Sequence, residues 1–402
     1  MKKISVLFIA ALSLLLCSCS RNEIEGEFDE CVISQNTTWY EDGMFYETAN
    51  SEGEPVLCYY SKTNDRSAVM CGMPECTHAY KTSPGCGALK ERDTFTREGY
   101  NRVGDKLYFL ALQSPTENST GSLDFIECDI DGKNQRLVAS IENTSLAFIN
   151  TVKYIDGHVL FSYYQNCGFV EDENTGKIEF VNYEKYKFYI KRIDISTGNV
   201  ETLVSREEYN GRGGGTVYQN TLYYNYSYNI EPPTGELLTF ETAPKSYSGF
   251  YIRDLSTGEE KGYKDISAMG ESYEYFSPDG IICYDSENDK LCRFVPETET
   301  FNNIAHYNMN GYTADGKNAL FIQSSDSEYW TGYDFETGEL TQLQPYAGDF
   351  DIHPNLTHTV GNTVWLEVVS ADDSSLRHAY IDRNDFFAGK FENIKLIKEV
   401  EL

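Results

Sequence analysis

The chain has 402 residues, of which 40% are hydrophobic, and this is enough to bury a sizeable core and to exclude an intrinsically disordered protein. Its 33 lysines and arginines stand against 63 aspartates and glutamates, which gives a formal charge of -30. A field of that sign repels phosphate backbones, so the composition argues against a nucleic-acid-binding protein.

The first residues have the layout of a bacterial export signal. Two lysines precede an apolar run from Ile4 to Leu16, which is too short to span a membrane comfortably. We therefore expect this segment to be removed on export and the mature protein to be extracytoplasmic.

The apolar run ends in Leu16-Cys17-Ser18-Cys19, which resembles the lipobox of bacterial lipoproteins. The resemblance implies that residues 1–18 are a lipoprotein signal peptide and that Cys19 carries the lipid. Several acyl chains, each buried CH₂ contributing about 0.8 kcal/mol, anchor a protein stably to a bilayer. An ordinary signal peptide with two incidental cysteines is the alternative. The polar, acidic residues 19–38 are predicted to form a flexible spacer after the lipidated cysteine.

A repeated pattern covers residues 39–402 and predicts an all-β protein. The 31 tyrosines and 22 phenylalanines favour strands over helices. A polar turn followed by a compact apolar run recurs as EDGMFY, GDKLYF, DGHVLF, QNTLYY, PDGIICY, DGKNALF and GNTVWL. Alternating stretches with Asp-x-x-Thr-Gly turns follow several of these runs, and such turns are typical of antiparallel hairpins.

The apolar runs do not alternate, which indicates strands covered on both faces. Small sheets stacked around an axis, as in a β-propeller, bury their inner strands in this way. Seven runs predict seven blades, with six or eight as alternatives, whereas a two-sheet sandwich should alternate throughout. The glycine-rich GRGGG (211–215) is expected to be a loop where blades approach.

A cysteine-rich insertion at about residues 70–88 contains the candidate site, formed by Cys71, Cys76, His78 and Cys86. Three thiolates and one imidazole suit tetrahedral Zn²⁺, and a set without an open position is structural rather than catalytic. Cysteines outside the cytoplasm tend to oxidise, so a Cys71–Cys86 disulfide or unpaired structural thiols are the alternatives. Export to an oxidising compartment favours the disulfide, whereas the presence of a histidine beside the cysteines favours the metal site.

A second cysteine pair lies in CYDSENDKLC. A two-residue loop at Glu287-Asn288 would place Cys283 opposite Cys292 on neighbouring strands. The Cα–Cα distance between directly opposed residues lies at the lower end of the range that disulfides span. We therefore predict a disulfide between them in oxidising conditions.

Taken together, the lipobox, the repeated turns and the Cys-x-x-Pro-x-Cys-x-His pattern resemble bacterial lipoproteins with low-density-lipoprotein-receptor-related-type or TolB-like propellers. The resemblance implies a fold and a location but no reaction. We expect a membrane-tethered binding or scaffold protein that recognises an envelope protein or glycan through its loops. An envelope carbohydrate-active enzyme, a lyase or hydrolase, is the alternative, although the sequence identifies no catalytic residues. Apart from structural zinc, no cofactor is expected.

Overall fold

The computed structural model describes most of the chain from residue 31 onward. The described residues are 31–34, 37–89, 94–114, 121–142, 147–165, 169–171, 178–180, 185–231, 245–268, 281–285, 287–288, 290–295, 298–306, 309–314, 318–323, 330–334, 337–343, 350–370 and 376–400. The predicted signal peptide and Cys19 lie outside these ranges.

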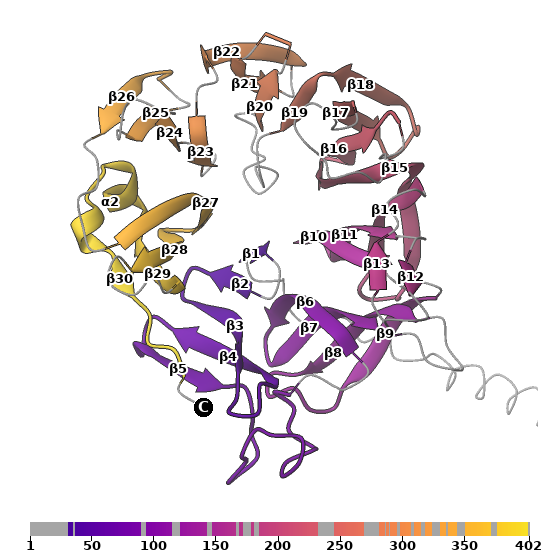
Figure 1. The fold of residues 1–402 in the computed structure, drawn as a ribbon, viewed down its shortest axis with the longest axis vertical. Helices are drawn as coiled ribbons and strands as arrows, with labels where there is room; N and C mark the ends of the chain where they lie inside the picture. The colour runs from indigo at the N-terminus through magenta and orange to yellow at the C-terminus, as the bar shows by residue number, and fades with distance from the viewer. Residues whose placement is uncertain are drawn as a thin grey trace, which may run out of the picture.

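The described chain is almost entirely β-strand, and its sheets follow one another around a common centre (Figure 1). The first sheet contains β1 (Cys31–Ser34), β2 (Thr37–Tyr40), β3 (Gly43–Ala49), β4 (Pro55–Ser61) and β5 (Arg66–Val69). The second contains β6 (Thr94–Val103), β7 (Lys106–Gln113), β8 (Ser122–Asp129) and β9 (Arg136–Glu142).

A larger sheet follows, with a separate two-stranded ribbon beside it. The large sheet contains β10 (Ala147–Ile155), β11 (His158–Gln165), β14 (Lys185–Asp194), β15 (Val200–Tyr218), β16 (Thr221–Asn229), β17 (Ser246–Asp254) and β18 (Glu260–Lys264). The ribbon consists of β12 (Phe169–Glu171) and β13 (Ile178–Phe180).

Three four-stranded sheets complete the arrangement. One contains β19 (Ile266–Ala268), β20 (Ile281–Asp285), β21 (Lys290–Val295) and β22 (Thr300–His306). The next contains β23 (Met309–Ala314), β24 (Asn318–Gln323), β25 (Trp330–Asp334) and β26 (Leu340–Leu343). The last contains β27 (Phe350–Val360), β28 (Thr363–Ser370), β29 (Leu376–Asp382) and β30 (Lys395–Leu396). A short helix, α2 (Arg383–Phe387), and a 3₁₀ turn, η2 (Phe391–Asn393), connect β29 to β30. No helix among the described residues is long and apolar enough to cross a membrane.

The repeated sequence turns form the predicted hairpins. Between β14 and β15 the Asp194 carboxylate accepts a hydrogen bond from the Thr197 amide at 2.9 Å, and Gly198 follows at φ 71°. The carboxylate thus replaces a backbone partner, and glycine takes the left-handed position at little steric cost. The Asp-x-x-Thr-Gly turns at residues 254–258 and 334–338 repeat the carboxylate-to-threonine-amide bond.

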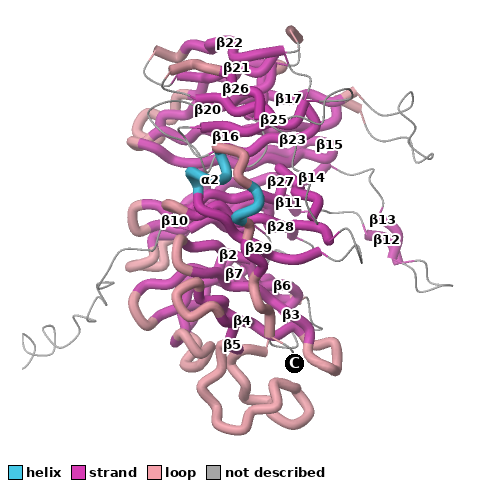
Figure 2. The backbone as a smooth tube through the Cα atoms, turned by 90° about the vertical axis from the view of Figure 1, so that its left-hand side faces the viewer, coloured by secondary structure: helices cyan, strands magenta, loops and turns pink. Residues whose placement is uncertain are grey.

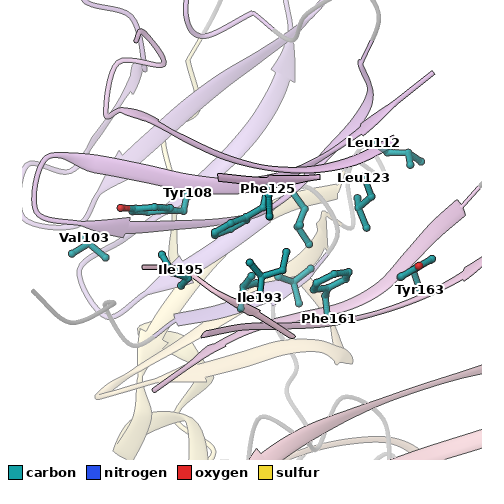
Figure 3. Packing of buried hydrophobic residues seen from close by; sticks show 13 residues of the cluster. Val103, Tyr108, Leu112, Leu123, Phe125, Phe161, Tyr163, Ile193 and Ile195 are labelled. Carbon is teal, nitrogen blue, oxygen red and sulfur yellow. The ribbon is translucent and has the colours of Figure 1, made fainter. Parts of the chain in front are cut away.

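Burial separates inner from outer strands as the apolar runs predict. All side chains of β7 except those at its two ends are buried, whereas β14 alternates along much of its length. Figure 3 shows one reason: Phe125 of the second sheet faces Phe161 and Ile193 of the next sheet. Sheets that pack face to face around a centre remove both faces of their inner strands from water.

The stretch GRGGG is strand rather than the expected loop. It lies within β15, whose 19 residues pair with β14 at one end and β16 at the other. A Cβ on Gly213 would lie 2.1 Å from the Asn225 carbonyl oxygen, and one on Gly214 would lie 2.6 Å from Thr151 Cγ2. The glycines therefore permit close approach of neighbouring backbone and side chains within a continuous strand.

The predicted spacer ends earlier than the sequence suggests. Residues 31–34 form β1, and β2 begins at Thr37, so the last part of residues 19–38 belongs to the first sheet. Val32 is buried against Trp39 and Trp365, and Ile33 packs on the cluster that contains Val152. Adjacent residues of a strand point to opposite faces, so Val32 and Ile33 are covered by different clusters, which explains why this short segment pairs as a strand despite its acidic surroundings.

Candidate metal centre

The cysteine-rich insertion connects β5 to β6 at the outer edge of the first two sheets. It forms the loops that project below β4 and β5 in Figures 1 and 2. The insertion then returns along the edge of β4, where the Leu57 amide donates to the Ala88 carbonyl at 2.9 Å and Val56 bridges Leu89. Both ends of the insertion are thereby fixed to the first sheet.

Short-range hydrogen bonds fold the loop back on itself. The Ser83 amide donates to the Ala79 carbonyl at 2.7 Å, and the Cys86 amide donates to the Ser83 carbonyl at 3.0 Å. The buried Ser83 hydroxyl accepts from the Thr77 amide at 3.2 Å. These turns bring the segment before residue 79 against the segment after residue 83.

The fold gathers the four predicted ligands at one point. The Sγ atoms of Cys71, Cys76 and Cys86 and a ring nitrogen of His78 all lie within 4.8 Å of one another. His78 Nδ1 lies 3.4 Å from Cys86 Sγ. Tetrahedral zinc with Zn–S bonds of about 2.3 Å separates its sulfur ligands by about 3.8 Å. The four donors therefore need to shift by about 1 Å or less to surround an ion of this size.

The disulfide alternative has no bond in the structure. Cys71, Cys76 and Cys86 are all free thiols, with Cys86 buried and the other two half-buried. A single disulfide would use two of the sulfurs and would give His78 no reason to lie within reach of all three. The chemistry of this donor set therefore fits Zn²⁺.

Backbone strain marks the ligand loop. Glu75 and His78 adopt positive φ values of 54° and 52°. Such conformations are uncommon for residues other than glycine and persist where surrounding contacts enforce them. At His78 the enforcing contact is visible, because Asn50 Nδ2 donates to the His78 carbonyl at 2.6 Å.

Asn50 fastens the insertion to the connection between β3 and β4. Its side chain is almost fully buried, and its Oδ1 accepts from the amides of Glu52 and Glu54, each at 2.9 Å. Glu54 Oε2 in turn accepts from the Tyr80 amide at 3.0 Å. The chain is therefore held at His78 and again at Tyr80, by an amide and a carboxylate that no sequence motif marks. An isolated Asn and Glu in a polar turn give no pattern from which to find them.

The surroundings shift the pKa values of the candidate ligands in different directions. Burial lowers the pKa of His78, which favours the neutral imidazole that metals bind. Burial raises the pKa of the Cys86 thiol to about 12. Burial also acts to raise the pKa of Cys76, but hydrogen bonds from the His78 backbone and the Ser83 side chain contribute to a net lowering.

The second cysteine pair has the expected register. Cys283 of β20 pairs directly with Cys292 of β21, and the last pair before the turn is Asp285 with Lys290. Both side chains are buried free thiols in the structure. The register is thus confirmed, whereas the disulfide is not formed in this structure and stays a prediction.

The described surface includes two clefts of similar size. A cavity of about 710 Å³ lies beside Cys86, against the β8–β9 turn that carries Lys133 and Asn134. A second, of about 700 Å³, lies between the first and last sheets. Glu41, Asp382, Asp385 and Glu392 all line it, and Asp382 and Asp385 accept hydrogen bonds from the Asn384 amide and the Asn393 side chain, respectively.

Comparisons with known proteins give the fold but no family. No family model and no curated protein matches the chain. Puromycin hydrolase is similar in structure, with a TM-score of 0.52, 9% identity and coverage of 95% of this chain and 55% of that enzyme.

Two further peptidases give similar values. The Mycobacterium tuberculosis puromycin-hydrolyzing peptidase has a TM-score of 0.51 and 9% identity, and the match covers 95% of this chain and 55% of that enzyme. The Pyrococcus horikoshii acylaminoacyl peptidase has a TM-score of 0.50 and 12% identity, and the match covers 93% of this chain and 52% of that enzyme. The chain thus spans about half the length of these enzymes. At such low identity the similarity supports an all-β, propeller-like fold and carries no activity over.

Proposed function

We propose that this protein is an extracytoplasmic, lipid-anchored propeller whose cysteine-rich insertion holds a structural Zn²⁺ ion. The observation that carries the metal assignment is the approach of four donor atoms, from Cys71, Cys76, His78 and Cys86, to within 4.8 Å of one another. With four protein ligands, a tetrahedral ion keeps no position for water or substrate. The ion would therefore fix the loop in place and would not perform catalysis.

In this proposal the sheets form a closed ring of seven blades. Four antiparallel sheets supply one blade each at β2–β5, β6–β9, β19–β22 and β23–β26, and β27–β30 supply another. The larger sheet supplies two, because β15 is long enough to be the outer strand of one blade and the inner strand of the next. Hydrogen bonds between the last and first sheets support closure.

The blades would serve as a binding or scaffold module for an envelope protein or glycan. Support comes from the lipobox and from the second cleft, where Asp382 and Asp385 each accept a hydrogen bond from a nearby residue. A membrane tether at Cys19 would concentrate such a module at the cell surface.

Metal analysis tests the zinc site. The protein purified without added metal is expected to carry about one equivalent of zinc per chain, and Cys76→Ser is expected to lose most of it. Cys128→Ser is the matched control, since Cys128 is a buried thiol outside the cluster. Zinc-free protein in which alkylation without reductant detects Cys76 but neither Cys71 nor Cys86 would show that the insertion is oxidised instead.

Binding is tested separately, with the mature protein immobilised over an array of bacterial glycans and by cross-linking in intact cells. Capture of one glycan class or one envelope protein supports a binding module. Turnover of any captured polysaccharide would favour the enzyme instead.

A carboxyl on an inner strand favours that second candidate, an envelope hydrolase or lyase. Glu98 lies on β6, the innermost strand of the second sheet, and burial raises its pKa to about 7, with nearby Glu47 adding to the rise. A carboxyl with such a pKa is suited to donate a proton near neutral pH. Glu98→Gln should abolish any polysaccharide cleavage without altering zinc content, and unchanged cleavage would exclude this acid.

A further inference from the structure

The direction of β1 determines the side on which the chain enters the ring. Cys31 pairs with Tyr40, and Ser34 pairs with Thr37. Tyr40 immediately precedes the tight turn at residues 41–42, so the N-terminal end of β1 lies at that end of the first sheet. β1 itself contacts β6, β10 and β27 and lies near the centre of the ring (Figure 1).

The same end of the ring carries tight turns of the neighbouring sheets. The Asn362 amide, in the β27–β28 turn, donates to Glu41 Oε1 at 3.1 Å. Arg102, next to the β6–β7 turn, forms a 2.7 Å ion pair with Asp42. We call this end, marked by residues 41–42, 104–105 and 361–362, the turn face. The opposite end, where residues 50–54 join β3 to β4, is the loop face.

The tether is short compared with the body of the protein. Cys31 lies twelve positions after Cys19, a reach of about 40 Å for a fully extended chain and about 20 Å for a flexible coil. To reach the loop face, the tether would have to run outward over one blade, a distance of about 20 Å. It would then have to run along the outside of the ring for the length of the strands, about 25 Å. Such a path is longer than the fully extended tether. The direct route through the centre of the ring is partly occupied by β1 and its neighbours.

We propose that the turn face of the ring is directed toward the lipid bilayer and that the loop face is directed away from it. This inference rests on the proposed lipid anchor at Cys19. The turn face carries acidic side chains, among them Asp42 and Asp105, which anionic headgroups repel, so tether length rather than adhesion sets the orientation. A soluble or cell-wall ligand would then be met by the loop face.

The two ends of β9 provide a matched pair of probe positions. Gln135, just before the strand, and Glu142, at its end, are both exposed. Asp129, next to the turn before Gln135, pairs with Lys106 beside the β6–β7 turn, which places Gln135 at the turn face. Seven residues of strand separate the probes by about 23 Å.

Energy transfer to a labelled bilayer tests the orientation. A donor dye is attached through an azide-bearing residue at position 135 or, in a second variant, position 142 of the natively lipidated protein. The vesicles contain phosphatidylethanolamine, phosphatidylglycerol and a headgroup-labelled acceptor lipid. Transfer is expected to be greater from position 135 than from position 142, and equal or reversed transfer would overturn the proposal.

Two controls separate the orientation from the anchor. A flexible Gly/Ser insertion of about 30 residues between Cys19 and Cys31 should reduce the difference between the probes, because the longer tether reaches around the rim. An undiminished difference would show that tether length is not the cause and would overturn the proposal. Cys19→Ala should abolish vesicle binding, and if it binds as before, the lipid anchor of the proposed function has failed instead.

Discussion

Trp365 Nε1 donates a hydrogen bond to the Tyr40 carbonyl at 2.8 Å, joining residues 325 positions apart. Both side chains are buried, and the bond connects β28 of the last sheet to β2 of the first. Near it, the Thr363 hydroxyl donates to the Glu41 carbonyl at 3.0 Å, and the Val400 amide donates to the Tyr46 hydroxyl at 3.1 Å. The two ends of the described chain are therefore held together by specific buried and partly buried polar contacts as well as by apolar packing.

Trp365→Phe is expected to destabilise the protein by about 1–3 kcal/mol, because the Tyr40 carbonyl loses a buried donor. The measurement is equilibrium urea unfolding followed by fluorescence. Trp39→Phe is the matched control: Trp39 is equally buried in the first sheet and stacks on His358 at 4.1 Å between ring centroids. If the two variants lose equal stability, the hydrogen bond contributes nothing beyond ring size.

Asn50→Ala is expected to weaken zinc binding by about 10- to 100-fold, as loss of outer-shell partners commonly does. The substitution removes the donor that holds the His78 carbonyl and the acceptor of the Glu52 and Glu54 amides. Competition with a chromogenic chelator measures the affinity. Glu52→Ala keeps the backbone amide that Asn50 binds and should leave the affinity unchanged. Unaltered zinc affinity in Asn50→Ala would contradict the positioning role.

Stability should fall as the pH rises from about 4.5 to about 7 because of Glu98. Its folded-state pKa of about 7 lies above the ordinary 4.5, so the folded protein binds the proton more tightly than the unfolded chain does. This stabilisation is fully present at pH values below the ordinary pKa, and it is lost as the pH rises to the folded-state pKa. Partial solvent screening limits the loss to about 1–2 kcal/mol.

Urea midpoints at about pH 5 and about pH 8 measure this loss, and Glu98→Gln should have the smaller difference between them. Glutamine keeps the size of the side chain and does not titrate. An identical pH dependence in the variant would exclude Glu98 as the source.

Cys283 and Cys292 are expected to form a disulfide when the protein is exposed to oxidant, because strand pairing places them directly opposite each other. Mass spectrometry of the peptide spanning both, alkylated with and without reductant, detects the bond. Two alkylated cysteines without reductant, after exposure to oxidant, would refute it. Cys128 provides an internal reference, since burial raises the pKa of its thiol to about 12 and slows its reaction.

The sequence by itself determined the local structure. Unbroken apolar runs such as Leu107–Leu110 predict strands buried on both faces, and the Asp-x-x-Thr-Gly turns predict hairpins, because both depend on residues close together in the chain. The candidate ligands Cys71, Cys76, His78 and Cys86 were also visible, since soft donors in a short glycine- and proline-rich loop carry their own signal.

Only the tertiary structure decided how these pieces meet. That β1 lies against β6, β10 and β27, and that β15 joins two neighbouring groups of strands, depends on packing between segments far apart in sequence. The meeting of Cys71, Cys76, His78 and Cys86 at one point likewise depends on distant contacts, such as the hydrogen bond by which Asn50 holds the His78 carbonyl. Contacts between segments distant in sequence arise from the shape and burial of whole sheets, which a local residue pattern does not encode.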